Sequence, residues 1–387
     1  MIRWTGGFVW FLVCVVASQV VVAEETNPAD PIPTTLNATE LNNSGITQVQ
    51  AGRWERGIAF LRRAITLYPK DTTVRKNLSL VLTDWAGQLQ RQQKIDLAIT
   101  TLQEAHELDS TNGIALIHLG DLLYFNRSDM AGAIEAWKKA YPHIPGLVKQ
   151  SLTSRIAQAR QDQQIEHGFL TRQSEHFDIR YQQSSDARVG KLEPILEDAY
   201  HKLSDEMATH PSRITVIVYT DEDLRRTYYQ RDWAIGFYDG RIRLRIQDLD
   251  QTYLQDLVVH ELTHAFLHQL YPNNLPIWLH EGFAQLHERD PETSEKIRDL
   301  KRAVTSRQSW IPLSWLDSHF QRPSSTQDIA RAYIESRFVV QTLMARYGIG
   351  RLKSFFKDIS EGTPLERAYE QAFSPSRWVK ASQGVFD

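Results

Sequence analysis

The sequence predicts a chain of two folded parts, an all-α region of helical repeats followed by an α+β domain. Small residues recur at matching places through residues 38–150, with spacings close to the period of a helix-pair repeat. From residue 170 onward, runs with strand-like patterns come first and runs with helical periodicity follow. Strands that precede helices in this way are typical of an α+β layout with an antiparallel or mixed sheet.

The length and composition of the chain are compatible with two folded domains and give no reason to expect a nucleic-acid partner. At 387 residues the chain is long enough for two domains. Its 44 basic and 47 acidic residues leave a net charge of −3, so nothing indicates a nucleic-acid partner. The 42% hydrophobic content is ordinary for a globular protein. The sole cysteine is Cys14, so the chain cannot form an internal disulfide.

Residues 1–23 have the composition of a secretory signal peptide. Arg3 gives a weakly positive start, residues 6–17 are almost wholly apolar, and a small-residue cleavage site ends the segment. The alternative is an uncleaved anchor, because residues 6–23 border on the length of a membrane span. We therefore expect an exported protein, periplasmic or secreted, which is anchored to a membrane only if this segment is retained. Residues 24–37, rich in Pro, Thr and Asn, are expected to form a flexible leader.

Residues 38–150 contain a degenerate repeat. Alignment on Ala64, Ala105 and Ala140 gives spacings of 41 and 35 residues. Because the tetratricopeptide period is about 34 residues, we expect an insertion in the first gap, near residues 87–94. A small residue at one place of each unit would let its two helices approach closely, and a proline would end a unit. The small residues are Gly57, Ala98 and Ala133, and the prolines are Pro69 and Pro145.

This region therefore resembles tetratricopeptide repeats, for which three units are about the minimum for a stable stack. Such a stack offers a concave surface that binds peptides or proteins. The alternative is a structural cap on the domain that follows, and the sequence leaves both open. Residues 151–169 are predicted to be a helical linker between the domains, because residues 151–166 are polar and rich in helix-forming residues.

Short runs after residue 170 predict the elements of the second domain. Residues 177–181 alternate between apolar and polar, and residues 214–219 form the β-branched run of a buried strand. Residues 192–209, between them, have helical periodicity. Asp239-Gly240 is a hairpin signal. In the strand after it, apolar residues alternate with arginines that either face a substrate or, as we favour, protect an exposed sheet edge. The apolar residues are Ile242, Leu244 and Ile246, and the arginines are Arg241, Arg243 and Arg245.

The run His260-Glu261-Leu262-Thr263-His264 has the spacing of a zinc-binding helix. Two histidines four residues apart lie one turn apart on the same helix face and can bind one metal ion. Glu261 is rotated by about 100° from His260 and can reach a water on that metal without ligating it. We expect the helix to be buried, because apolar residues recur with its period. These residues are Leu254, Leu257, Val258, Leu262, Ala265 and Phe266.

A second segment, residues 276–284, supplies a third ligand. Sixteen residues separate His264 from Glu281, enough for the end of one helix, a turn and the start of another. A second helix packed antiparallel on the first would return Glu281 to the metal. Three protein ligands leave one position open, as catalytic zinc needs. The alternative is a core helix with two hydrogen-bonded histidines and a surface glutamate.

Residues 276–284, Pro-Ile-Trp-Leu-His-Glu-Gly-Phe-Ala, resemble the matching segment of gluzincin metallopeptidases, whose third zinc ligand is a glutamate on a following helix. Segments at residues 175–181, 236–244 and 332–336 narrow the resemblance to the peptidase-MA-like domain found beside tetratricopeptide repeats in bacterial exported proteins. The resemblance covers about residues 170–360. It implies a zincin-like metallopeptidase domain at residues 170–387, with Zn²⁺ on His260, His264 and Glu281 and with Glu261 as the general base.

The resemblance also implies two contacts with substrate. Strand 242–246 would be an edge strand that pairs with an extended peptide. Tyr333, on a downstream helix, is the candidate donor to the oxyanion, with core packing against Phe338 and Tyr347 as the alternative. Gln285, four residues after Glu281, could hydrogen-bond to a ligand histidine and fix its orientation, although a role in packing or an exposed position is the favoured interpretation.

Three further histidines, His268, His280 and His287, receive no role. His268 lies one turn beyond His264, but a fourth ligand would close the site. His280 and His287 fall off the metal face of their helix. Leu270 stands where metzincins have a third histidine, which excludes that class.

The predicted function is therefore that of an exported zinc-dependent peptidase, expected to be an endopeptidase, with repeats that bind a protein or peptide substrate or another protein partner. The rival from another class is a protein-binding scaffold whose zinc domain has lost turnover. The intact Glu261 argues against this rival. An aminopeptidase ranks low, because no Gly-rich motif with a nearby glutamate precedes the metal helix.

Overall fold

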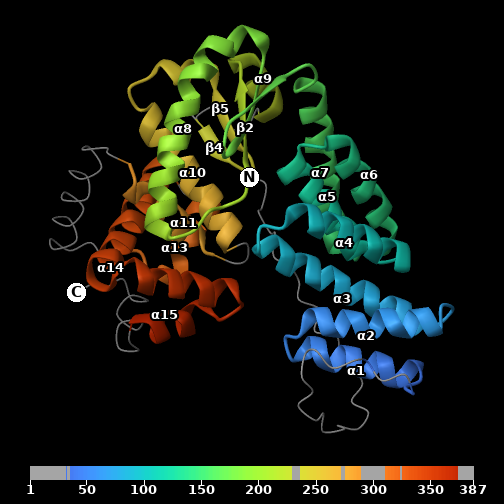
Figure 1. Cartoon of the computed structure of the whole chain (residues 1–387). Coiled ribbons are helices and arrows are strands. Elements are labelled where there is room, and N and C mark those ends of the chain that lie inside the picture. Colours follow the sequence, from blue (N-terminus) through green and yellow to red (C-terminus); the bar gives the residue numbers. More distant parts are fainter. Residues whose placement is uncertain are drawn as a thin grey trace. The chain divides into compact units, whose positions relative to one another are not determined.

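The computed structural model of the chain describes residues 32, 35–228, 236–271, 275–288, 310–322 and 325–373 (Figure 1). The predicted signal peptide and most of the predicted leader lie outside the described residues. The chain divides into two units at His167 and Gly168. Of the helices in the described ranges, none has the combined length and apolar character that a membrane span requires.

The N-terminal unit is built of helices that pack against their neighbours in the sequence. Helix α1 pairs with α2, α3 with α4 and α5 with α6, while α7 packs on α6. Helix α7 covers most of the predicted linker and is part of this unit. The bounds are α1 (Ala38–Gln50), α2 (Trp54–Leu67), α3 (Thr72–Arg91), α4 (Ile95–Leu108), α5 (Gly113–Arg127), α6 (Met130–Ala140), the short 3-10 helix η1 (Tyr141–His143) and α7 (Gly146–Ile165).

Small residues bring the paired helices together. A Cβ atom added at Gly57 would lie 2.7 Å from the carbonyl oxygen of Gly45, so the backbones of α1 and α2 touch there. In the third pair, a Cβ at Gly120 would lie 2.4 Å from Trp137 Nε1. Helix α3 has 20 residues, whereas α1 has 13 and α5 has 15. The longer α3 accounts for extra residues in the 41-residue spacing between Ala64 and Ala105. The assignment of these pairs to the tetratricopeptide class stays a prediction.

The C-terminal unit contains a mixed sheet whose described strands lie in the order β1-β2-β3-β5-β4. The central strands β2, β3 and β5 are parallel, and β1 and β4 are antiparallel to their neighbours. The two buried strands and the hairpin are where the sequence predicts them, whereas β1 has no pattern that predicts it. The bounds are β1 (Leu170–Gln173), β2 (Phe177–Tyr181), β3 (Ile214–Tyr219), β4 (Gly236–Tyr238) and β5 (Ile242–Arg245).

Helices connect these strands and follow them. Helix α8 (Asp186–Met207) joins β2 to β3, and α9 (Asp221–Tyr228) follows β3, with 3-10 turns at η2 (Gln183–Ser185) and η4 (Ile246–Asp250). After the sheet come α10 (Leu254–Leu270), α11 (Ile277–Leu286), α13 (Leu313–Gln321), α14 (Thr326–Ser360) and α15 (Leu365–Phe373). Helix α14 changes direction at Gly348, whose φ of 73° lies in the left-handed region that glycine tolerates.

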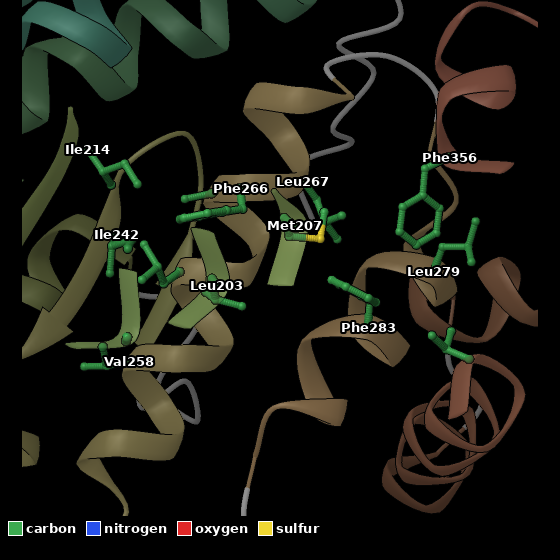
Figure 2. Close-up of a cluster of buried hydrophobic side chains, with 14 of the residues drawn as sticks. Leu203, Met207, Ile214, Ile242, Val258, Phe266, Leu267, Leu279, Phe283 and Phe356 are labelled. Atoms are coloured by element: carbon green, nitrogen blue, oxygen red, sulfur yellow. The ribbon is translucent and has the colours of Figure 1, made fainter. Parts of the chain in front are cut away.

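One hydrophobic core joins β2, β3 and β5 to α8, α10, α11, α13, α14 and α15. Figure 2 shows side chains from the sheet and from α8, α10, α11 and α14 in this core, among them Phe283 of α11. The rings of Phe283 and Phe356 meet edge to face at 5.5 Å between centroids. Because α10 and α11 bury most of their apolar side chains here, their polar residues are held in fixed directions.

The strand after the hairpin is not the edge strand that the resemblance implies. Strand β5 lies between β3 and β4, so the edges among the described strands are β4 on this side and β1 on the other. Arg241 and Arg243 are fully buried and do not protect an edge. Arg243 Nε lies 2.9 Å from Asp239 Oδ1, and its guanidinium also donates to the Tyr219 hydroxyl. A guanidinium with such partners can be buried. The alternation of apolar residues and arginines in the sequence predicts exposed arginines and gives no sign of these partners.

Gly282 sets the distance between α11 and α14. A Cβ at this position would lie 2.4 Å from the Ser336 carbonyl oxygen and 2.7 Å from Val340 Cγ2. We expect Gly282→Ala to lower the free energy of unfolding by about 1–3 kcal/mol, because the helices must separate. Thermal or urea unfolding would measure the change. The control is Gly350→Ala in α14, where a Cβ meets nothing within 4 Å. There the better helix propensity of alanine should stabilise by up to about 1 kcal/mol, and equal destabilisation of both variants would contradict the close approach.

Candidate metal centre

Helix α10 carries the first two candidate ligands on one face. The Nε2 atoms of His260 and His264 point toward each other and lie 3.2 Å apart. The opposite side of the helix is anchored in the core, with Val258, Leu262 and Ala265 fully buried. The spacing of four residues thus places both imidazoles at one point, as predicted from the sequence.

Helix α11 brings Glu281 to the same point. Its Oε2 atom lies 3.5 Å from His260 Nε2 and 3.6 Å from His264 Nε2. The start of α11 is held by α13, because the Trp278 amide donates to Asp317 Oδ1 at 3.1 Å. The buried amide of Gln285 donates to the Glu281 and Tyr333 carbonyl oxygens at 3.1 Å each, so Gln285 fastens α11 to α14.

The three donor atoms fit a zinc ion. A tetrahedral zinc with bonds of about 2.0–2.1 Å has ligand atoms roughly 3.3 Å apart, and the three separations here are 3.2, 3.5 and 3.6 Å. Glu281 Oε2 is buried and has no hydrogen-bond partner, a costly state for a carboxylate oxygen that a cation would relieve. Two imidazoles and one carboxylate are a ligand set that leaves a coordination position open.

The charges of the site suit these roles. Burial would raise the pKa of Glu281, but His264 and His260 outweigh it and hold the pKa well below that of an ordinary glutamate. Glu281 is therefore ionised, as a ligand must be. Burial raises the pKa of Glu261, and the nearby histidines only partly oppose the shift. Glu261 Oε2 is also buried without a hydrogen-bond partner, so this carboxylate is available to take a proton.

Glu288 is a residue of the site that the motifs do not predict. Its Oε1 atom lies 2.5 Å from His260 Nδ1. With a metal bound, a carboxylate at Nδ1 would hold the proton there and leave the Nε2 lone pair for the metal. The available signal was weak: Glu288 follows Glu281 by seven residues, the spacing of about two helical turns, but α11 ends at Leu286, before Glu288.

Removal of this carboxylate should weaken metal binding without removing a ligand. We expect Glu288→Ala to lower the zinc affinity by about 10–100-fold, because His260 loses the partner that fixes its tautomer and ring orientation. Competition with a chromophoric chelator would measure the affinity. The control is Glu206→Ala, which breaks a similar pair, since Glu206 Oε2 lies 3.0 Å from His287 Nε2. Equal affinities of the parent and Glu288→Ala would contradict an orienting role.

The three unassigned histidines have other surroundings. The His268 ring meets Tyr238 at 5.7 Å, and burial lowers its pKa to about 4. The His280 ring lies 5.8 Å from that of His264, and burial lowers its pKa to about 3. His287 pairs with Glu206. The cluster of His260, His264 and Glu281 includes none of them.

The structure places Tyr333 beside Phe320, with the rings edge to face at 5.0 Å. Of the two residues named in the packing alternative, Phe338 stacks on Trp310 and Tyr347 contacts Phe373, and the packing of Tyr333 against them stays a prediction. Tyr333 is half-buried. Its main-chain carbonyl oxygen accepts a hydrogen bond from the side-chain amide of Gln285, which lies one helical turn after Glu281. Its role as an oxyanion donor stays a prediction.

A comparison with known families agrees with this geometry. The family model of the Peptidase MA superfamily matches residues 196–375, from within α8 to just past α15. This segment contains both helices that carry the candidate ligands and begins after the first two strands, so it starts later and ends later than the resemblance noted above. No curated protein matches the chain. The match supports a zincin-like peptidase domain of the metallopeptidase type in residues 196–375.

Proposed function

We propose that the protein is a zinc-dependent peptidase of the gluzincin type, with His260, His264 and Glu281 as ligands and Glu261 as the general base. The observation that carries this proposal is the meeting of three donor atoms within 3.6 Å, beside a second buried carboxylate that has no hydrogen-bond partner. A metal centre that served only to hold the fold would be closed by a fourth protein ligand and would have no use for that second carboxylate.

When bound, zinc would supply Lewis acidity toward a carbonyl oxygen and would make water more acidic. The chain supplies the proton transfer. Glu261 takes a proton from the attacking water and delivers it to the leaving amine, a role that suits a carboxylate whose pKa is raised by burial. Glu281 and Glu288 stay aimed at the histidines, so their charges fix the imidazoles rather than move protons.

Substrates would be proteins or peptides. Of the two edge strands of the described sheet, β1 and β4, it is β4 that packs against α10. An extended peptide can therefore add to β4 by backbone hydrogen bonds and place a peptide bond near the metal face of α10. In this proposal β4 takes the role that was expected of residues 242–246, which is backbone pairing with an extended peptide substrate. Tyr333 remains the proposed oxyanion donor, and the helical repeats are proposed to bind the substrate or a partner protein outside the cytoplasm.

Peptide cleavage by the purified protein tests the proposal. The protein would be incubated with a mixture of unstructured peptides, and the products identified by mass spectrometry. We expect internal cleavage that stops with a zinc chelator and returns when Zn²⁺ is added. Removal of single N-terminal residues would instead indicate an aminopeptidase. Bound zinc without cleavage of any peptide would favour the scaffold, and a folded protein that binds no metal would refute the proposed function.

A further inference from the structure

We propose a second metal-binding site in the C-terminal unit, made by Glu175, His176 and His201. One donor atom from each residue lies within 4.8 Å of the others. Glu175 and His176 are in the turn between β1 and β2, and His201 is on α8. The site shares no residue with the centre on α10 and α11, and it does not depend on the peptidase function.

His176 is the fixed member of this site. Its amide and its ring Nδ1 both contact the carboxylate of Glu197, at 3.1 and 2.7 Å. Its carbonyl oxygen accepts the amide of Ile214 at 2.9 Å, and its ring stacks on Tyr200 at 3.8 Å between centroids. Backbone and ring are thus held from several sides.

The contact with Glu197 selects the state of His176 that binds a metal. The Glu197 carboxylate, 2.7 Å from Nδ1, accepts the proton of that nitrogen and so leaves Nε2 with a lone pair for a metal. The first centre has an equivalent contact, in which the carboxylate of Glu288 lies against Nδ1 of His260. This orienting partner separates the cluster from a chance gathering of surface histidines.

The other two members are free to close on Nε2. Glu175 Oε1 lies 3.9 Å from His176 Nε2, and the Glu175 side chain is 75% exposed. The exposed imidazole of His201 stands perpendicular to that of His176, with 5.3 Å between centroids. Zinc ligands lie roughly 3.3 Å apart, so each donor must move by about 1.5 Å at most. Exposed side chains can make such a movement by a small rotation about their own bonds.

The donor set determines the kind of metal. Two imidazoles and one carboxylate suit Zn²⁺ and, more tightly, Ni²⁺ or Cu²⁺, whereas Mg²⁺ and Ca²⁺ prefer oxygen ligands alone. The exposure of two ligands makes the ion exchangeable. An ion there would join the β1–β2 turn to α8, so its effect would be to stabilise this corner of the domain.

The test compares zinc binding by His201→Ala and Glu175→Gln with that of the parent protein. Each substitution is made alone and together with His264→Ala. Zinc binding at the site of Glu175, His176 and His201 can then be measured whether or not the centre on α10 and α11 also binds zinc. His210→Ala is the matched control, since His210 is an exposed histidine of the same unit outside the cluster. Equilibrium dialysis gives the zinc bound per chain, and calorimetric titration with ZnCl₂ gives the affinity.

We expect His201→Ala to bind one zinc fewer than its parent in both backgrounds, and Glu175→Gln to weaken the same event by at least about tenfold. In the His264→Ala protein, added zinc should raise the midpoint of thermal unfolding, and His201→Ala should abolish that rise. Zinc binding that is unchanged by both His201→Ala and Glu175→Gln would overturn the proposal. An equal loss in His210→Ala would overturn it too, because it would show unspecific surface binding.

Discussion

His264→Ala is expected to remove the zinc of the proposed active site and with it all peptidase activity. The substitution deletes one of three donor atoms, and the two that remain, His260 Nε2 and Glu281 Oε2, are 3.5 Å apart. Loss of a group that only orients a ligand costs about 10–100-fold in metal affinity, so loss of a ligand should cost more than about 100-fold. Metal analysis of the purified variant should find one zinc per chain fewer than in the parent.

The matched control for this prediction is His268→Ala, one helical turn further along α10. Both residues are half-buried histidines of the same helix, but the ring contact of His268 is with Tyr238. We expect His268→Ala to keep the zinc and most of the activity. If the two substitutions reduced the zinc content equally, the ligand set would be wrong. If His264→Ala kept its zinc and its activity, the peptidase proposal would fail.

Glu261→Gln is expected to keep the zinc and lower kcat/KM for peptide cleavage by about 10²–10⁴-fold, the usual contribution of a general base. Glutamine has the size of glutamate, so the packing of α10 is preserved. It cannot take the proton of the attacking water, and the donor atoms of His260, His264 and Glu281 are untouched. Cleavage of a fluorogenic peptide selected from the product analysis would measure the loss, beside the zinc content of the same preparation.

Retained zinc together with lost activity is the result that separates a base from a ligand. If Glu261→Gln lost its zinc, Glu261 would be a ligand and the assignment of Glu281 would need revision. If the variant cleaved peptides as fast as the parent, another group would be the base. Because the inactive variant still holds its metal, it would also trap bound substrates for identification.

Much of the site was predictable because its pattern is local. A spacing of four residues places His260 and His264 on one helix face in any α-helix. The turn residues after α10 and the apolar pattern of α11 predict a returning helix, and the structure brings Glu281 to within 3.6 Å of both imidazoles. Glu288 was not predicted, because an orienting carboxylate is recognised by its distance from Nδ1 and has no fixed place in the motif.

Local patterns in the sequence were enough to predict the elements whose cause lies within one segment. These are the β-branched strand at residues 214–219, the hairpin at Asp239-Gly240 and the two helices that carry the candidate ligands. The folded structure was needed to show that β5 is not an edge strand, how Arg243 is buried, and that Glu175 and His176 lie near His201. Periodicity and turn chemistry act over only a few neighbouring residues. The order of strands, the pairing of buried charges and clusters across elements depend on contacts between segments far apart in the chain, which no local pattern encodes.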